Sequence, residues 1–164
     1  MSTIVPIAIS IVRCNNQYLF LKRKNPPYEN LWSMIGGKIG VGEHIADAAK
    51  REIMEETGTQ NVDTYEYRGI VSERLVLADN TLSAHFLIFI GSAKISDYRE
   101  NHREGELALF SLDELNSLQD QFVPSDLRMF SSFRTACESP LLYEAELVHE
   151  DGRYALRYYR KARD

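Results

Sequence analysis

The chain has few cysteines and only a short apolar run near its N-terminus, which argues against a disulfide-rich or a membrane-spanning protein. It contains two cysteines, Cys14 and Cys137, whose separation matches no metal-binding or redox motif, so we expect both to be reduced and structural. The apolar run at Ile4–Val12 is too short to span a bilayer, it contains Pro6, and no basic leader precedes it. These features predict a cytoplasmic protein that does not insert into a membrane.

Acidic residues outnumber basic ones, 24 to 19. The formal net charge of -5 argues against a general electrostatic grip on nucleic acid or on an anionic membrane, although a local basic pocket for phosphates is compatible with it. There is no internal repeat and no low-complexity linker, and 44% of the 164 residues are hydrophobic, enough for one core. The composition therefore predicts one compact unit that acts on a small molecule.

What the chain does contain is a glycine-rich loop followed by an acidic helix, in the segment Gly37–Gly58. At about 100° per residue, Glu52, Glu55 and Glu56 fall within one quadrant of that helix. Its apolar residues lie on the same side: Ile45, Ala48 and Ala49. Carboxylates that point toward the protein body repel one another unless a proton or a cation compensates, and oxygen ligands favour Mg²⁺ or Mn²⁺.

The alternative is a solvated surface helix in which Arg51 pairs with Glu55 one turn later. The complete spacing favours the metal site. Gly37, Glu43 and the run Arg51–Gly58 stand at the intervals of the signature box of the Nudix hydrolase family, which the segment resembles at every charged and glycine position. The last box position, usually a large aliphatic residue, is Thr59; because that is a packing position, the departure leaves the chemistry intact.

The resemblance implies roles for the matching residues. Glu52 and Glu56 would be the principal carboxylate ligands of the metal, and the Gly37 carbonyl a backbone ligand. Glu55 would be a further ligand or would orient a water, and Arg51 would hold and orient a glutamate. Glu43 would close the loop or reach the metals through water. The implied activity is hydrolysis of a diphosphate by a metal-activated water, with Mg²⁺, or Mn²⁺, as the cofactor.

A further acid is expected from a later loop, because many Nudix enzymes draw one from the region that Glu104–Leu115 resembles. Glu106 stands at the better position and Glu104 is the reserve. A carboxylate there would act as general base or hold a second metal, and the sequence does not separate these roles. The alternative is that both are solvated loop acids.

The substrate is left open. The resemblance implies that a residue beyond the box is characteristic of the substrate: a proline in ADP-ribose enzymes and a tyrosine in diadenosine polyphosphate enzymes. The chain carries neither residue there. Trp32 or Phe20 would stack on a base, or else belong to the core. Arg23 and Arg74 would contact phosphate or the terminal group of the substrate, or else be solvated.

Three functions are therefore compared. The leading one is a hydrolase of a nucleoside diphosphate linked to another moiety, acting on an oxidised purine nucleotide or a nucleotide sugar. The second is a ligand-binding sensor that keeps the Nudix fold without turnover, which predicts a damaged box that is not seen. The third is an interaction module. The expected partner is a small nucleotide-type molecule, and a homodimer is an option because Nudix proteins often pair.

The pattern predicts an α+β fold, a mixed sheet with helices in α/β/α layers, over a Nudix-like domain of residues 1–139. Alternation and turn residues predict strands at 7–12, 17–23, 64–77, 83–93 and 107–110, and helices at 112–118 and 124–137 besides the box helix.

The last segment, 140–164, predicts a β-hairpin extension packed on the same domain, with its turn at Asp151-Gly152. We expect it to cover a sheet edge and to be structural rather than catalytic. The alternatives are a dimer contact and a wall over the active site.

Overall fold

Strand β1 (Ile4–Cys14) runs through the middle of a ten-stranded sheet in the computed structural model, which describes residues 3–136 and 141–161. Its residues from Ala8 to Val12 are all buried, because the strand is covered on both faces. Ile9 and Ile11 belong to the main hydrophobic cluster, whereas Ala8 packs in another cluster with helix α1 (Ile45–Thr57). This arrangement explains the continuous apolar run near the N-terminus.

The main path of the sheet runs β10-β9-β5-β6-β1-β2-β8-β7. The long strands β5 (Thr64–Leu77) and β6 (Leu82–Lys94) form the expected antiparallel pair, and β6 is parallel to β1. The short β3 pairs with β2, and β4 pairs with β1. The remaining strands of this part are β2 (Gln17–Arg23), β3 (Trp32–Ser33), β4 (Ile35–Lys38), β7 (Asn101–His102) and β8 (Gly105–Phe110).

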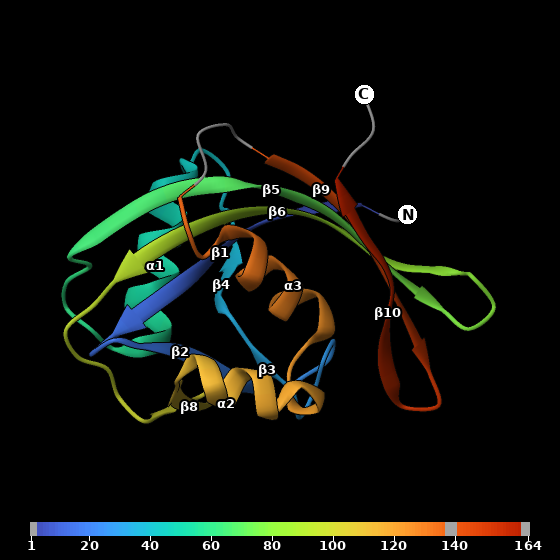
Figure 1. Ribbon diagram of the computed structural model, residues 1–164. Helices are drawn as coiled ribbons and strands as arrows, with labels where there is room; N and C mark the ends of the chain where they lie inside the picture. Colours follow the sequence, from blue (N-terminus) through green and yellow to red (C-terminus); the bar gives the residue numbers. More distant parts are fainter. Residues whose placement is uncertain (1–2, 137–140, 162–164) are drawn as a thin grey trace.

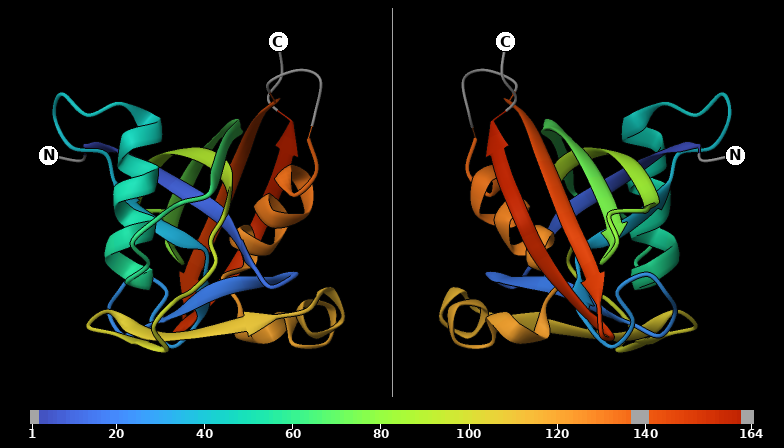
Figure 2. Two further views of the ribbon diagram at one scale, coloured as in Figure 1. Left: turned by 90° about the vertical axis from the view of Figure 1, so that its left-hand side faces the viewer. Right: turned by 90° about the vertical axis from the view of Figure 1, so that its right-hand side faces the viewer.

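Helices cover both faces of the sheet. Helix α1 lies on one side, and α3 (Pro124–Phe133) lies on the other, within the curve of β5 and β6 (Figures 1 and 2). Helix α2 (Leu112–Ser117) and the 3₁₀ turn η1 (Gln119–Gln121) connect β8 to α3. The α+β fold with helical layers on both faces is therefore confirmed. No helix among the described residues is long and apolar enough to cross a membrane.

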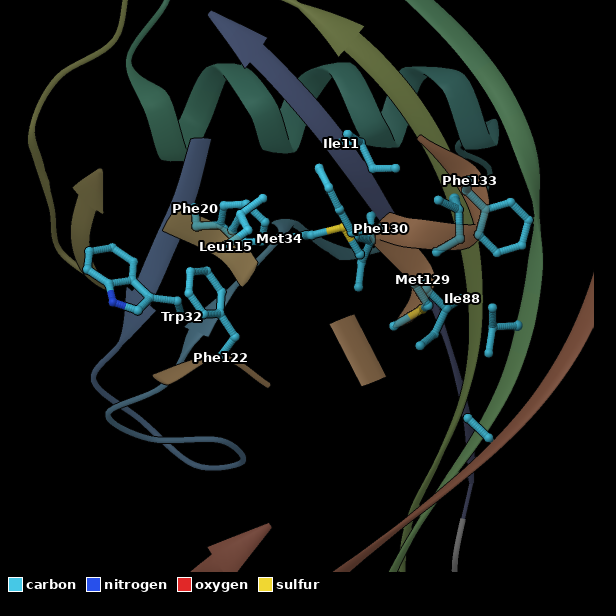
Figure 3. Packing of buried hydrophobic residues seen from close by; sticks show 14 of the residues in the cluster. Ile11, Phe20, Trp32, Met34, Ile88, Leu115, Phe122, Met129, Phe130 and Phe133 are labelled. Carbon is cyan, nitrogen blue, oxygen red and sulfur yellow. The ribbon is translucent and has the colours of Figure 1, made fainter. Parts of the chain in front are cut away.

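The core beneath α3 is rich in aromatic side chains (Figure 3). Phe20 packs edge-on against Phe122 with ring centroids 5.0 Å apart, and Phe110 meets Trp32 at the same separation. Edge-to-face packing adds to the free energy gained from burying these large rings. The core thus fixes β2, β3 and β8 against the segment that precedes α3.

The C-terminal hairpin consists of β9 (Leu141–Glu150) and β10 (Arg153–Lys161). Its turn is at Asp151-Gly152, where both residues have positive φ, 49° and 72°, as a two-residue hairpin turn requires. Strand β9 pairs in parallel with β5, so the hairpin extends the sheet beyond β5. The boundary expected at 139/140 lies outside the described residues.

Several boundaries differ from the sequence-based ones by a few residues. Helix α3 ends at Phe133, before the expected Cys137, and that cysteine lies outside the described residues. Strand β8 begins at Gly105, earlier than expected, because pairing with β2 extends to Arg23. Cys14 is buried and free, as a structural thiol would be.

Candidate active site

The glycines of β4 let a carboxylate approach the backbone. Gly36 and Gly37 pair with Ile9 and Ala8 of β1. A Cβ atom placed on Gly37 would lie 2.5 Å from the carboxyl carbon of Glu52, far inside normal contact distance. The Glu52 carboxylate therefore rests directly on the Gly37 backbone, which explains why glycine is required there.

Helix α1 presents its acids at three depths. Glu56 is 4% exposed and belongs to the buried side of the helix. The side chain of Glu52 is 15% exposed, whereas that of Glu55 is 53% exposed. The helix ends at Gly58, whose left-handed backbone (φ 73°) donates its N–H to the Met54 carbonyl, as expected for a C-cap. Two of the three acids thus face inward and Glu55 faces solvent.

Arg51 joins these acids to the loop that precedes the helix. Its Nη1 donates to Glu52 Oε1 at 2.6 Å and to Glu55 Oε2 at 3.2 Å. Its Nε and Nη2 donate to the two oxygens of Glu43 at 2.8 and 3.0 Å, and Nη2 also donates to the Lys38 carbonyl at 3.0 Å. The guanidinium therefore fixes the direction of the Glu52 carboxylate and closes the loop onto the helix.

The ionisation of this network follows from its contacts. Hydrogen bonds from Arg51, and then from the Gly40 N–H, lower the pKa of Glu43 to about 2. Hydrogen bonds to Glu43 and Glu52 raise the pKa of Arg51. Glu43 and Arg51 are thus both charged throughout the physiological range and form a permanent ion pair.

Glu56 is in the opposite situation. Burial raises its pKa well above the ordinary value, and the negative charges of Glu104 and Glu52 add to the effect, against an opposing hydrogen bond from the Gly36 N–H at 3.1 Å. A carboxyl group in this position requires a proton or a nearby cation.

The residues fit a hard divalent cation in their chemistry. Glu52, Glu56 and the Gly37 carbonyl offer oxygen donors only, which Mg²⁺ and Mn²⁺ prefer. Within residues 3–136 and 141–161, no His, Cys, Asp and Glu side chains already form a group of three or more that could hold an ion. Instead, Arg51 holds Glu52 and Glu55, and Glu56 bonds to Gly36.

The later acid nearest to this network is Glu104. It lines the groove beside Glu52, and its charge raises the pKa of Glu56. Glu106 is exposed in β8, where it pairs with Lys22 and Asn101. The sequence ranked Glu106 ahead of Glu104 as the further acid. In the structure Glu104 is the one that lies nearer to Glu52 and Glu56, because it belongs to the β7–β8 turn, which approaches α1.

A groove of about 490 Å³ adjoins Gly37 and Glu52. Arg23 and Lys38 line it and supply positive charge suited to phosphates. Arg23 Nε donates to the Pro27 carbonyl at 2.9 Å, which ties the arginine to the loop after β2. Arg23, expected to bind substrate, thus lies in the groove.

Three other expected substrate contacts lie elsewhere. Trp32 is 6% exposed and packs in the main core beside Phe122 (Figure 3), and it does not line the groove. Phe20 is 1% exposed in the same core. Arg74 is about half exposed and forms an ion pair with Glu146 of β9 at 3.5 Å. The two aromatic rings fill the core, and Arg74 links β5 to the hairpin.

The groove contains two buried acids that the sequence did not single out, Glu73 and Asp126. Burial raises the pKa of Asp126 to about 7, with a smaller contribution from Glu73, against an opposing 2.7 Å hydrogen bond from the Met34 N–H. Burial likewise raises the pKa of Glu73, whose Oε1 accepts a 2.9 Å hydrogen bond from the Tyr28 hydroxyl. Its Oε2 is buried without a hydrogen-bond partner among the described residues.

A sequence signal for Glu73 exists in the alternation of β5. Val71, Glu73 and Leu75 occupy successive inward positions, so an acid replaces an apolar side chain in a buried row. Asp126 follows Pro124 in the first turn of α3, where an acid is ordinarily explained by the helix dipole. Both were missed because the sequence alone does not show which side chains of β5 and α3 face the groove.

Residues 5–133 match the family model of the NUDIX domain, and this match covers most of the chain. The chain belongs to the NUDIX family. The NUDIX domain therefore includes the glycine loop, α1, the groove and both buried acids, whereas the C-terminal hairpin lies beyond the matched residues.

Relatives of this NUDIX chain include nucleotide-processing enzymes. It is 42% identical over 48 residues to an ADP-ribose pyrophosphatase of Methanocaldococcus jannaschii, a match covering 29% of this chain and 28% of the relative. It is 42% identical over 50 residues to a putative 8-oxo-dGTP diphosphatase of Bacillus subtilis, covering 30% and 32%. Each match thus spans about a third or less of the relative's own length.

The crystal structure of a MutT protein from Bacillus halodurans resembles the whole molecule. It superposes with a TM-score of 0.72 at 25% identity and covers 96% of this chain and 97% of the other. The similarity therefore extends over nearly the full length of this NUDIX chain.

Proposed function

We propose that the protein is a hydrolase that depends on Mg²⁺, or Mn²⁺, and cleaves a diphosphate bond in a nucleoside diphosphate linked to another moiety. The observation that carries this proposal is the Glu52 carboxylate resting on the Gly37 backbone, next to the buried Glu56, in the wall of a groove that Arg23 and Lys38 also line. Family membership and the names of the relatives support it.

Each residue of the site has a separate role in the proposed hydrolysis. Glu52, Glu56 and the Gly37 carbonyl would hold the ion, which supplies charge neutralisation on the phosphates and an activated water when it is bound. Arg51 orients Glu52 through its 2.6 Å hydrogen bond. Glu55, exposed beside Arg51, is placed to orient a water at the solvent side.

Glu104 is our candidate for the group that accepts a proton from the attacking water. It lies next to the groove and to Glu56, whereas Glu106 faces solvent from β8. A general base must reach the proton that it removes, so placement decides between the two. Arg23 and Lys38 would contact the phosphates.

The two buried acids indicate the class of substrate. A buried carboxylate oxygen without a partner is costly unless a ligand supplies a hydrogen-bond donor. The N–H groups of a purine base would satisfy Glu73 and Asp126, so we favour a purine nucleotide. The name of the second relative, an 8-oxo-dGTP diphosphatase, favours a triphosphate, including an oxidised one, over a nucleotide sugar.

The test is a panel of nucleotides with Mg²⁺ or Mn²⁺ and product identification by mass. We expect 8-oxo-dGTP to be cleaved to the monophosphate, with ADP-ribose and a nucleotide sugar as comparison substrates. Binding of nucleotides without any turnover would favour the ligand-binding sensor. Absence of both binding and turnover would favour the interaction module.

The other expectations from the sequence stay predictions. A cytoplasmic location, a small-molecule rather than nucleic-acid partner and a homodimer are each compatible with the fold, and light scattering measures the last.

A further inference from the structure

A small hydrophobic cluster joins the C-terminal hairpin to the groove. Its buried members are Tyr28, Leu75, Val123 and Leu147, and hairpin residues Tyr154 and Leu156 pack against them. Leu147 and Val123 are fully buried. The hairpin thus shares a core with three segments of the NUDIX domain, although it lies beyond the residues that match the family model.

Tyr154 is the hairpin residue that contacts the wall of the groove. Its ring meets Tyr28 edge-on with centroids 4.9 Å apart, and its hydroxyl donates to Glu29 Oε2 at 2.9 Å. On its other side, His149 stacks on the ring with centroids 4.2 Å apart. Residues 26–28 line the groove, so Tyr154 supports the loop that forms part of its wall.

Tyr28 connects Tyr154 to Glu73, one of the buried acids of the groove. Its hydroxyl makes the 2.9 Å hydrogen bond to Glu73 Oε1, and the Ser125 hydroxyl is the other group that stabilises the charged form of this carboxyl. Leu75, two residues along the same inward row of β5, packs in the shared cluster with Tyr28. The position of the Glu73 carboxylate therefore depends on where Tyr28 lies.

The second acid is connected to the same cluster. Val123 precedes α3 and is followed closely by Asp126 in its first turn, and the Val123 N–H donates to the Trp32 carbonyl at 2.9 Å. Hairpin packing on Val123 thus also supports the segment that carries Asp126.

We propose that the C-terminal hairpin determines substrate specificity, and that Tyr154 is a positioning residue that sets Glu73 through Tyr28 for contact with the base of the substrate. This inference rests on the proposed function and adds to it an element outside the matched family domain. The sequence-based expectation that the hairpin is structural rather than catalytic stays a prediction, to which this inference adds a role in positioning Glu73.

The experiment compares Tyr154→Ala with Tyr158→Ala. Tyr158 is on the same strand, has Arg160 over its ring at 4.4 Å from the centroid, and is absent from the cluster around Tyr28. Both substitutions remove a tyrosine ring from the hairpin, so a general loss of hairpin stability affects both. Only Tyr154→Ala removes the support of Tyr28.

Kinetics are measured with 8-oxo-dGTP and with base-free ribose 5-triphosphate. We expect Tyr154→Ala to raise KM for the nucleotide by about 10-fold while changing kcat less than about twofold, and to leave KM for the base-free compound unchanged. Tyr154→Phe keeps the ring against Tyr28 and should restore most of the nucleotide KM. Tyr158→Ala should leave the nucleotide KM unchanged.

Two further measurements keep the test decisive. Tyr28→Phe keeps the ring packing and removes the hydrogen bond to Glu73, so it should raise the nucleotide KM even if Tyr154→Ala fails to fold. Calorimetric binding of 8-oxo-dGMP requires no turnover, and the same ranking of variants in Kd would support the inference even if the proposed hydrolysis fails.

Equal KM for both alanine variants, or an unchanged KM and Kd in Tyr28→Phe, would overturn the inference. So would a wild-type protein that does not bind 8-oxo-dGMP.

Discussion

The guanidinium of Arg51 has all of its nitrogens engaged within the site, with hydrogen bonds to Glu43, Glu52, Glu55 and the Lys38 carbonyl. Such a fork has one orientation, because each nitrogen points to a different acceptor. Arg51 therefore acts as a rigid support for Glu52 rather than as a free positive charge for the substrate. The phosphates are left to Arg23 and Lys38.

Changing Glu52 or Glu56 to glutamine tests the metal assignment. We expect turnover to fall by about 10²-fold or more, since each change removes a charged ligand. In metal-free buffer, Glu56→Gln should hold or raise the midpoint of thermal unfolding, because burial already disfavours the charged form of Glu56. Asp113→Asn, on α2, is the exposed control. Full turnover of both variants at limiting Mg²⁺ would refute the assignment.

Glu104→Gln and Glu106→Gln separate the two later acids. Glu104 lies beside the groove, so its variant should lower kcat by about 10²-fold with little change in KM, the scale of general-base loss. Glu106→Gln should change kcat less than about threefold, since that side chain faces solvent. Steady-state rates at saturating Mg²⁺ decide, and the reverse ranking would return the role to Glu106.

Asp126 makes stability depend on pH. Burial raises its folded-state pKa to about 7, above an ordinary value of 3.8, so the folded protein retains a proton that the unfolded chain releases. The free energy of unfolding should therefore fall as pH rises from about 4 to about 7, by up to roughly 4 kcal/mol, and then level off. Urea unfolding across this range measures the slope. Glu56 and Glu73, whose pKa values are also raised, contribute in the same direction. Asp126→Asn should therefore make the slope smaller, and an unchanged slope in that variant would contradict the assignment.

At the scale of single residues, the sequence was informative where spacing is strict. The box placed Gly37, Glu52 and Glu56 together because helix geometry and a tight loop leave few alternatives. Trp32 and Arg74 were predicted from residue type alone, and long-range packing decides whether an aromatic ring enters the core or a groove. Glu73 required knowledge of which face of β5 is buried.

At the scale of elements, β4, the glycine loop and α1 form one unit, held by Gly37 at one end and Arg51 at the other. Gly37 does not have positive φ, so alanine is compatible with its backbone, but a Cβ there would meet the Glu52 carboxylate. The need for glycine is thus a need for close approach rather than for an unusual backbone conformation.

Gly37→Ala is expected to fold with a small loss of stability and to lose turnover by about 10²-fold, because Glu52 must move away from the backbone. The measurement is the initial rate as a function of Mg²⁺ concentration, together with circular dichroism. Unchanged activity at limiting Mg²⁺ would show that the contact of Glu52 with the backbone is not part of the site.

The ends of elements were predicted less well than their existence. The capping box of α2, in which Ser111 and Glu114 exchange hydrogen bonds, and the Gly58 cap of α1 are local signals that a sequence displays directly. Helix α3 has no such signal at its end and stops at Phe133, earlier than its pattern suggested.

At the scale of the whole molecule, the order of the strands in the sheet could not be predicted from the sequence. The parallel pairing of β9 with β5 joins segments about seventy residues apart, and alternation along a strand does not reveal its neighbour. Alternation, together with the turn at Asp151-Gly152, did predict that a C-terminal hairpin exists. Strand β10 ends the sheet and carries Arg153, Arg157, Arg160 and Lys161, charges that discourage further edge pairing.

Removing the hairpin should therefore affect both stability and specificity. A chain of residues 1–139 would leave β5 as an edge strand and would uncover Leu75 and Val123, which are 3% and 0% exposed in the full chain. Together with Tyr28, their loss of burial should cost roughly 5 kcal/mol of unfolding free energy. Thermal unfolding and light scattering of the two chains measure this, and an unchanged midpoint would contradict the shared core. Because the box, Gly37 and Glu104 all remain, the folded fraction should still cleave base-free ribose 5-triphosphate in the presence of Mg²⁺, while its preference for the nucleotide declines.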